Sequence, residues 1–581
     1  MALFGWTGKG LEVDLTNSEW KRTTLSEEAC RHFLGGRGLA VNLISEEMDP
    51  QADPLAAEAS LVFAAGPLTG TRTPTSGRHA VAAKSPLTGT IFDANSGGRF
   101  GTELKRAGLD YILLRGRAPS PVVLTIRDEE IEIEPAEDLW GLNCTDTLAK
   151  MNNFASACCI GRAAENGALL AGIMNDGHSL AGRGGLGAVM ANKNLKAIAI
   201  SGSGKPRIAN IERFDGALEE INRLIVASPV ASKGLSNYGT PALVNLINYM
   251  RIMPTANFRD SFFKQAEDLS GETIADTYAR YRAPCHACPI GCKHSEKGSR
   301  LPLPEYETIA MLGPDCSNPS LETVVEANRL CNDYGLDTIS VGATLACYSE
   351  EEGRTLSKEE ILSLIRQIGE GEGLGAELGK GSLQFSGRHN RDDLSMSVKG
   401  LELPGYDPRG ALGMALGYAT SNRGGCHLRA YMIGPEIFGK PKLIDRLSWS
   451  GKAGLVAIFQ NFFAAVDSLV VCKFLTFSVG EEELADALSA ATGIAFSTED
   501  LLKVGERIWN AERLFNLGAG LDSEDDTLPQ RFFSESTEAG LKPLQKDEFA
   551  NALRQYYACR GWDEEGQPST EKLTELGLTR G

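Results

Sequence analysis

The chain has 581 residues, of which 42% are hydrophobic and 23% charged, and its formal net charge is −18. This composition excludes disordered and fibrous proteins, and the acidic balance disfavours a nucleic-acid binder. A length of about four typical domains predicts two to four domains. No stretch is long and apolar enough to span a bilayer, and the N-terminus does not read as a signal peptide, so we expect a cytoplasmic protein without a membrane span.

The first 205 residues alternate short apolar runs with glycine-rich turns. The runs predicted to be strands are 60–65, 79–83, 111–116, 122–126, 130–135 and 196–201. Two of them, 122–126 and 130–135, flank a charged turn and are predicted to form a hairpin. Residues 202–206, with the sequence GSGKP, are predicted to be a linker.

After this linker, apolar residues recur at helical spacing. The predicted helices are 213–227, 321–334, 358–369, 452–466, 481–491, 498–517 and 546–559. Ser497 followed by acidic residues is a typical helix start. We therefore predict an α+β protein, in which a β-rich N-terminal domain (1–205) is followed by two mainly α-helical domains (206–405 and 406–581).

The strongest local signal is a C-x2-C-x3-C run formed by Cys285, Cys288 and Cys292. A [4Fe–4S] cluster takes four thiolates, and here one loop would supply three of them and a distant residue the fourth. Zinc would accept three cysteines with His286, His294 or a distant cysteine. The spacing alone leaves both sites open.

Three glycine-rich segments lie in the first domain, at 35–39, 95–101 and 181–187, and each contains an arginine. A glycine-rich loop that opens a helix presents free N–H groups to an anion, and an arginine adds a bidentate phosphate partner. None of the three fits the standard mononucleotide or dinucleotide fingerprints. Together they indicate a large cofactor that carries several phosphates or a pyrophosphate.

These segments, with 66–70 (GPLTG) and 73–89, occur in an order that closely resembles the tungsten-containing aldehyde:ferredoxin oxidoreductase family over nearly the whole chain. The resemblance implies oxidation of small aldehydes to carboxylic acids at tungsten held by two pyranopterins, with molybdenum as the alternative metal. It implies one [4Fe–4S] cluster, Mg²⁺ bridging the pterin phosphates, and a ferredoxin or ferredoxin-like acceptor, with or without a flavin subunit. Run backwards, the same site would reduce acids.

The resemblance also implies roles for individual residues. Glu307 and His427 would be the acid/base pair beside tungsten, and Cys472 would be the fourth cluster ligand. Cys472 lies five residues after Asp467, as in the family, but the usual Gly-Leu pair between them is missing. The residues implied to bind the cofactor are Arg78, Asn95, Gly97, Ala181, Arg183, Gly184, Gly185, Asn332, Asp337 and Asp467. In this scheme the first domain forms the base of the pterin site, and the cofactor lies where the domains meet.

In the implied mechanism, Glu307 takes a proton from the attacking water and His427 hydrogen-bonds the carbonyl oxygen. Two other interpretations stay open. One is a catalytic subunit of the same family that reduces the aromatic ring of an aryl-CoA thioester, which an extra cysteine ligand near Glu307 would favour. The other is a zinc-stabilised binding scaffold without redox activity.

Overall fold

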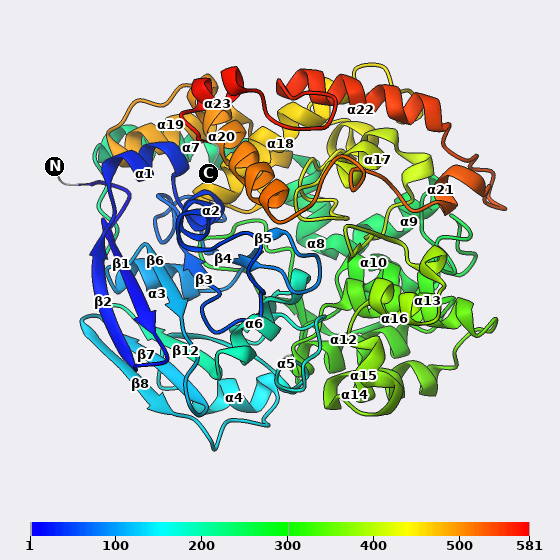
Figure 1. Cartoon of the computed structure of the whole chain (residues 1–581), viewed down its shortest axis with the longest axis horizontal. Helices are drawn as coiled ribbons and strands as arrows, with labels where there is room; N and C mark the ends of the chain where they lie inside the picture. The colour runs from blue at the N-terminus through cyan, green and yellow to red at the C-terminus, as the bar shows by residue number, and fades with distance from the viewer. Residues whose placement is uncertain (1–2, 300, 580–581) are drawn as a thin grey trace.

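The structure is a computed structural model that describes residues 3–299 and 301–579. Its N-terminal part is rich in strands, and the rest of the chain is mostly helical (Figure 1). The first sheet has six strands in the order β2-β1-β6-β3-β4-β5. Its strands are β1 (Lys9–Asp14), β2 (Glu19–Thr24), β3 (Leu61–Ala64), β4 (His79–Lys84), β5 (Ile91–Ser96) and β6 (Tyr111–Arg115).

The second sheet also has six strands, in the order β11-β10-β9-β12-β7-β8. Its strands are β7 (Val122–Arg127), β8 (Glu130–Pro135), β9 (Ser156–Cys159), β10 (Ile173–Asn175), β11 (Ser179–Ala181) and β12 (Leu195–Ser201). Strands β7 and β8 pair antiparallel, which confirms the predicted hairpin. Strand β12 pairs in parallel with β7 and carries the chain out of the β-rich part.

The helices of the β-rich part cover the sheets. They are α1 (Glu27–Phe33), α2 (Gly36–Glu47), α3 (Phe100–Arg106), α4 (Cys144–Lys150), α5 (Arg162–Glu165) and α6 (Leu186–Asn192). The glycine-rich segment at 35–39 begins α2 and is packed against protein backbone. A Cβ on Gly36 would lie 2.5 Å from the carbonyl oxygen of Asp467, and one on Gly38 would lie 2.3 Å from that of Phe33. The glycines allow this close approach of chain segments.

Most of the following helices lie to the right and lower right in Figure 1, and the first of them lies near the top. They are α7 (Ile211–Ala227), α8 (Ser236–Tyr238), α9 (Leu243–Tyr249), α10 (Gly271–Thr277), α11 (Tyr306–Leu312), α12 (Leu321–Tyr334), α13 (Thr338–Glu351), α14 (Lys358–Glu370), α15 (Gly373–Leu378) and α16 (Ser382–Arg388). Two small hairpins accompany them, β13 (Arg280–Arg282) with β14 (His294–Glu296), and β15 (Ser397–Val398) with β16 (Leu401–Glu402).

The C-terminal helices run across the top of the molecule (Figure 1). They are α17 (Leu412–Ala419), α18 (Lys452–Leu469), α19 (Glu481–Thr492), α20 (Thr498–Gly518), α21 (Arg531–Ser534), α22 (Lys546–Arg560) and α23 (Thr570–Leu576). The seven helices expected from periodicity are present with small differences at their ends. Ser497 caps α20 through a reciprocal pair of hydrogen bonds with Asp500, as its position before an acidic turn indicates.

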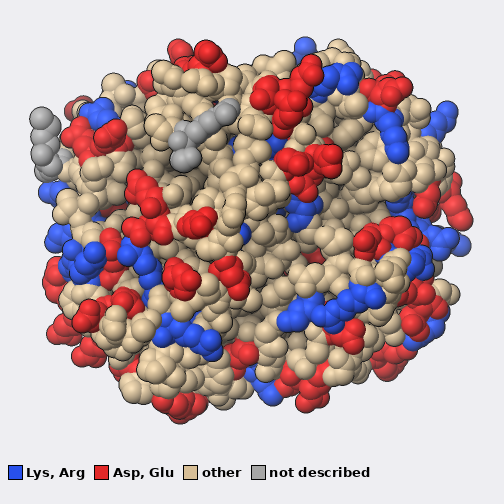
Figure 2. Space-filling model, in the orientation of Figure 1, with Lys and Arg blue, Asp and Glu red and all other residues tan. Residues whose placement is uncertain are grey.

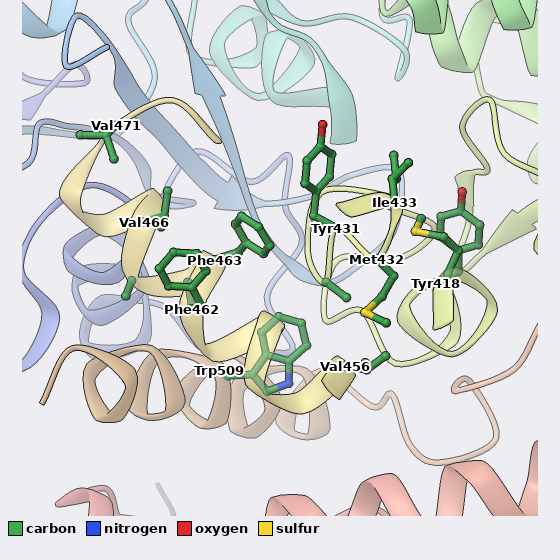
Figure 3. Close-up of a cluster of buried hydrophobic side chains, with 14 of the residues drawn as sticks. Tyr418, Tyr431, Met432, Ile433, Val456, Phe462, Phe463, Val466, Val471 and Trp509 are labelled. Atoms are coloured by element: carbon green, nitrogen blue, oxygen red, sulfur yellow. The ribbon is translucent and has the colours of Figure 1, made fainter. Parts of the chain in front are cut away.

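Helix α18 organises the core, where it packs against α20, α22 and α2. The buried side chains around it include Phe462, Phe463 and Trp509 (Figure 3). This packing brings the first and last parts of the chain together. Arg37 on α2 is fully buried, and its Nε and Nη2 donate to the two carboxylate oxygens of Glu512 on α20, each at 2.6 Å.

On the face shown in Figure 2, acidic and basic side chains are interspersed, so the acidic excess forms no single patch there. Among the described residues, no helix is long and apolar enough to cross a membrane. The β-rich and helical parts agree with the predicted fold class, whereas the division of the helical part at residue 405 stays a prediction.

Candidate active site

A cavity of about 360 Å³ lies where the three parts of the chain meet. Its wall includes β5 and the segment before β4, the cysteine loop after β13, the start of α11, the segment from 423 to 431 and the end of α18. The first and last of these segments are hundreds of residues apart in sequence. The core around α18 therefore positions the cavity, since it fixes both ends of the chain against each other.

Glu307 and His427 face each other on this wall. Glu307 is the second residue of α11, and its Oε1 lies 3.3 Å from the Nε2 of His427, although no hydrogen bond joins them. Burial raises the pKa of Glu307 to about 7, against the opposing effects of the Gly405 N–H and Arg183. Burial, with Arg183 and other nearby cations, lowers the pKa of His427 well below its ordinary value. Near pH 7 the pair is thus a titrating carboxyl beside a neutral imidazole.

The four predicted cluster ligands, Cys285, Cys288, Cys292 and Cys472, lie on the same cavity wall. Thr75 connects the two segments that carry them. Its backbone N–H donates to the carbonyl of Ala287 at 2.8 Å, and its hydroxyl accepts from the N–H of Cys472 at 3.2 Å. The thiols are close enough to affect one another electrostatically.

Burial, and to a smaller extent the neighbouring Cys472, raises the pKa of Cys288 to about 11. Burial alone would lower the pKa of Arg78, but the thiols of Cys472, Cys285 and Cys292 raise it on balance. Arg78 thus lies beside the thiols, as the resemblance implies. Across residues 3–299 and 301–579, no group of three or more His, Cys, Asp or Glu side chains is arranged to hold a single metal ion. A cubane cluster differs in its needs, because each thiolate binds a separate iron.

Most of the residues predicted to bind the cofactor also reach the wall. Those on it are Arg78, Asn95, Gly97, Arg183, Asn332, Asp337 and Asp467. Ala181, Gly184 and Gly185 are not among the lining residues. A Cβ on Gly184 would lie 2.7 Å from the ring of Phe92, and one on Gly185 would lie 2.7 Å from the carbonyl oxygen of Leu169. These two glycines allow close packing behind the wall.

Several buried polar atoms around the cavity have no protein partner. They are Nδ2 of Asn95, Nε of Arg423, Nδ1 of His427 and Oε1 of Glu307. Buried polar groups in folded proteins are almost always hydrogen-bonded. The cavity therefore fits a large polar group with both acceptors and donors, as an anionic pterin cofactor has.

Asp467 is held by cations that the sequence analysis did not identify. Its Oδ2 accepts from Nη1 of Arg429 at 3.0 Å, its Oδ1 accepts from Lys473, and Arg37 approaches at 3.5 Å. Arg429 also binds Asp93. Burial alone would raise the pKa of Asp93, but Arg429, Arg37 and Arg423 outweigh this effect and lower that pKa to about 2. Arg423 and Arg429 flank His427 in sequence, and they are the sequence signal from which this group of buried ion pairs could have been found.

Four thiols, a buried carboxyl–imidazole pair and unpartnered polar atoms around one cavity are the arrangement expected of a cofactor-dependent oxidoreductase. The family description "Aldehyde ferredoxin oxidoreductase, N-terminal domain" matches residues 10–202, and "domains 2 & 3" of the same family match residues 216–578. The chain belongs to the aldehyde ferredoxin oxidoreductase family and is an enzyme of the oxidoreductase class. This confirms the resemblance and the fold class inferred from sequence.

Similar proteins cover the whole chain. The tungsten-containing aldehyde ferredoxin oxidoreductases of Pyrococcus furiosus and Thermococcus kodakarensis are each 45% identical to it, with 99% of both chains covered. A WOR-like subunit of an aliphatic sulfonate oxidoreductase from Pyrococcus furiosus is 28% identical. Among solved structures, the active site complex BamBC of benzoyl coenzyme A reductase matches with a TM-score of 0.85 at 23% identity, covering 99% of this chain and 97% of that chain. This last likeness concerns the fold alone.

Proposed function

We propose that this protein oxidises aldehydes to carboxylic acids at a tungsten bis-pyranopterin centre in the cavity. Electrons would pass through one [4Fe–4S] cluster to a ferredoxin or ferredoxin-like acceptor in the cytoplasm, and a strong reductant would drive acid reduction. The observation that supports this best is the Glu307–His427 pair, 3.3 Å apart on the wall that also carries four cysteines. The names of the relatives that are 45% identical point to the same reaction.

The residues present fit these groups. Cys285, Cys288, Cys292 and Cys472 would hold the cluster, and Arg78 would lie between it and a pterin. The residues proposed to hold the pterins and their bridging Mg²⁺ are Asn95, Gly97, Arg183, Asn332, Asp337 and Asp467. When bound, the tungsten centre supplies two-electron redox capacity and Lewis acidity, and the cluster carries electrons one at a time. The parts 1–205, 206–405 and 406–581 are proposed to be domains that enclose the centre.

The chain's own contribution is hydrogen bonding and proton transfer. The overall reaction converts aldehyde and water into carboxylic acid, two protons and two electrons. His427 stays neutral near pH 7, so its N–H donates to the carbonyl oxygen as that oxygen gains charge. Glu307, with a pKa of about 7, accepts a proton from the attacking water and returns it to solvent.

No observation favours the aryl-CoA reductase alternative over this function. That alternative needs a cysteine near Glu307 that reaches the metal. Cys316 is the next cysteine downstream, and its thiol donates to the carbonyls of Met311 and Gly342, at 3.2 and 3.3 Å. The Cys316 thiol is therefore hydrogen-bonded within the helical core.

Metal analysis of the purified protein, with anaerobic reduction of benzyl viologen by a panel of aldehydes, tests the proposal. We expect tungsten with about four iron atoms per chain and dye reduction that depends on aldehyde. Zinc alone, or tungsten-loaded protein that leaves every aldehyde unchanged, would refute it. If molybdenum is found in place of tungsten, the proposed reaction stands and only the identity of the metal changes.

Cysteine variants test the cluster separately. Cys472→Ser removes one of four thiolates, so we expect most iron and most dye reduction to be lost. Cys559→Ser is the matched control, because Cys559 lies exposed on α22. Full iron content in the Cys472 variant would exclude this residue as a ligand.

A further inference from the structure

Tyr431 has a hydroxyl without a partner at the edge of the cavity. The residue is only 5% exposed, yet it lines the cavity wall. Within the described part of the chain, its hydroxyl makes no hydrogen bond, unlike that of Tyr418, which donates to the carbonyl of Tyr406 at 3.2 Å. The hydroxyl oxygen itself is accessible and not sealed in protein, so it is free to bond a ligand in the cavity that the residue lines.

The aromatic ring of Tyr431 is held from several sides. Phe463 meets it edge-on at 5.7 Å between ring centroids, Phe477 lies at 5.7 Å, and His427 lies at 6.4 Å. Figure 3 shows the hydroxyl pointing away from the cluster of hydrophobic side chains on which the ring rests. The packing therefore fixes the direction of the hydroxyl without using it.

The backbone at Tyr431 is also unusual. Its φ is +46°, in the left-handed region of backbone conformation that residues other than glycine rarely adopt. Two hydrogen bonds hold this turn, from the N–H of Tyr431 to the carbonyl of His427 at 3.1 Å and from the N–H of Gly434 to the carbonyl of Tyr431 at 3.0 Å. The strained turn links Tyr431 directly to the catalytic histidine, which fixes the two side chains relative to each other.

Tyr431 lines the same cavity as Glu307, His427 and Cys472. Burial is the main cause that raises the pKa of Tyr431 far above its ordinary value, and Cys472, Glu307 and Cys292 raise it further. Because the phenol keeps its proton at every working pH, its hydroxyl can donate a hydrogen bond throughout the reaction.

We propose that the Tyr431 hydroxyl is a third substrate-contacting group, which donates a hydrogen bond to the oxygen of the aldehyde and then to a carboxylate oxygen of the product. The inference rests on the proposed function and extends it. Tyr431 transfers no proton and no electron, so it orients substrate and product beside Glu307 and His427. Its hydrogen bond to the anionic product should be the stronger one, since charged acceptors bind donors more tightly.

The test compares Tyr431→Phe with wild-type holoenzyme, using benzaldehyde as substrate and benzoate as product. We expect the dissociation constant of benzoate to rise about tenfold, and kcat/KM for benzaldehyde to fall about as much. Tungsten content, iron content and melting temperature should match the wild type. Benzoate affinity equal to that of wild type would overturn the proposal.

Two control variants separate the hydroxyl from packing. Tyr418→Phe removes a buried hydroxyl that is bonded to protein, and Phe463→Leu removes packing from the Tyr431 ring but keeps its hydroxyl. Tyr418→Phe should bind benzoate within about threefold of wild type, since it keeps the contact to the carboxylate. Phe463→Leu loosens the direction of the Tyr431 hydroxyl but keeps the hydroxyl itself, so it should weaken benzoate less than Tyr431→Phe does. If Phe463→Leu weakens benzoate as much as Tyr431→Phe does, ring packing explains the effect and the proposal fails.

The proposed function and the role of Tyr431 can fail separately. A wild-type enzyme that oxidises no aldehyde would refute the proposed function, and benzoate binding would still decide the role of Tyr431. Active wild type with an unchanged Tyr431→Phe variant would refute this inference and leave the proposed function standing.

Discussion

The pH dependence of catalysis follows from the buried carboxyl of Glu307. As a base it works only when ionised, and its pKa is raised to about 7, so kcat/KM for an aldehyde should rise with pH through neutrality. His427, whose pKa lies well below its ordinary value, stays neutral across this range and adds no second step there. The expected profile is a single rising limb.

The size of the change can be worked out from that pKa. About one Glu307 in eleven is ionised at pH 6, and about ten in eleven are ionised at pH 8. The value of kcat/KM should therefore rise about tenfold between these two pH values. Replacing the base by Glu307→Gln should lower kcat/KM by about 10² to 10⁴ and remove the slope.

The assay is anaerobic dye reduction at low aldehyde concentration, with tungsten and iron measured in each sample. Glu305→Gln is the matched control. The Glu305 carboxylate is 53% exposed and lies 3.4 Å from Lys293, so its loss should leave the profile unchanged. A flat profile from pH 6 to 8 in wild type, or the same slope in Glu307→Gln, would refute the assignment of the base.

Two further predictions concern stability. Arg37→Met should lower the free energy of unfolding by about 3–5 kcal/mol in urea titrations, because it leaves the buried carboxylate of Glu512 unpaired; a loss under about 1 kcal/mol would contradict this. Gly505→Ala places a Cβ 1.8 Å from the carbonyl oxygen of Asn461, so it should destabilise the α18–α20 contact by about 1–3 kcal/mol. Gly454→Ala, where a Cβ meets nothing within 4 Å, should stabilise α18 slightly, and equal effects of the two alanines would show that close packing is not the cause.

Sequence periodicity found the helices that have one polar face. Helix α12 was expected at 321–334 and occupies those residues. Helix α17 was missed, because all eight of its residues, Leu412–Ala419, are buried and its sequence shows no polar face. Strand β5 was missed for a different reason, since its end at Asn95 and Ser96 belongs to a run of small residues typical of turns.

Local motifs carry the part of the candidate site that a sequence can indicate. The three cysteines of one loop and the residues of the glycine-rich segments stand close in sequence, so their spacing carries information. The ion pairs of Asp467 could be predicted only in part this way, because Lys473 is six residues away in sequence whereas Arg37 is 430 residues away. Glu305 and Glu307 are two residues apart in sequence, yet 53% of the Glu305 side chain is exposed against 18% of that of Glu307.

The clamp between Arg37 and Glu512 has a consequence for how the protein is made. The two residues are 475 positions apart. At about 5–20 residues per second, the ribosome adds the second roughly 24–95 s after the first. Throughout that interval Arg37 lacks the carboxylate that neutralises it, and for most of it the cavity wall lacks Asp467 and Cys472. The cavity can therefore be completed only after most of the polypeptide has been made.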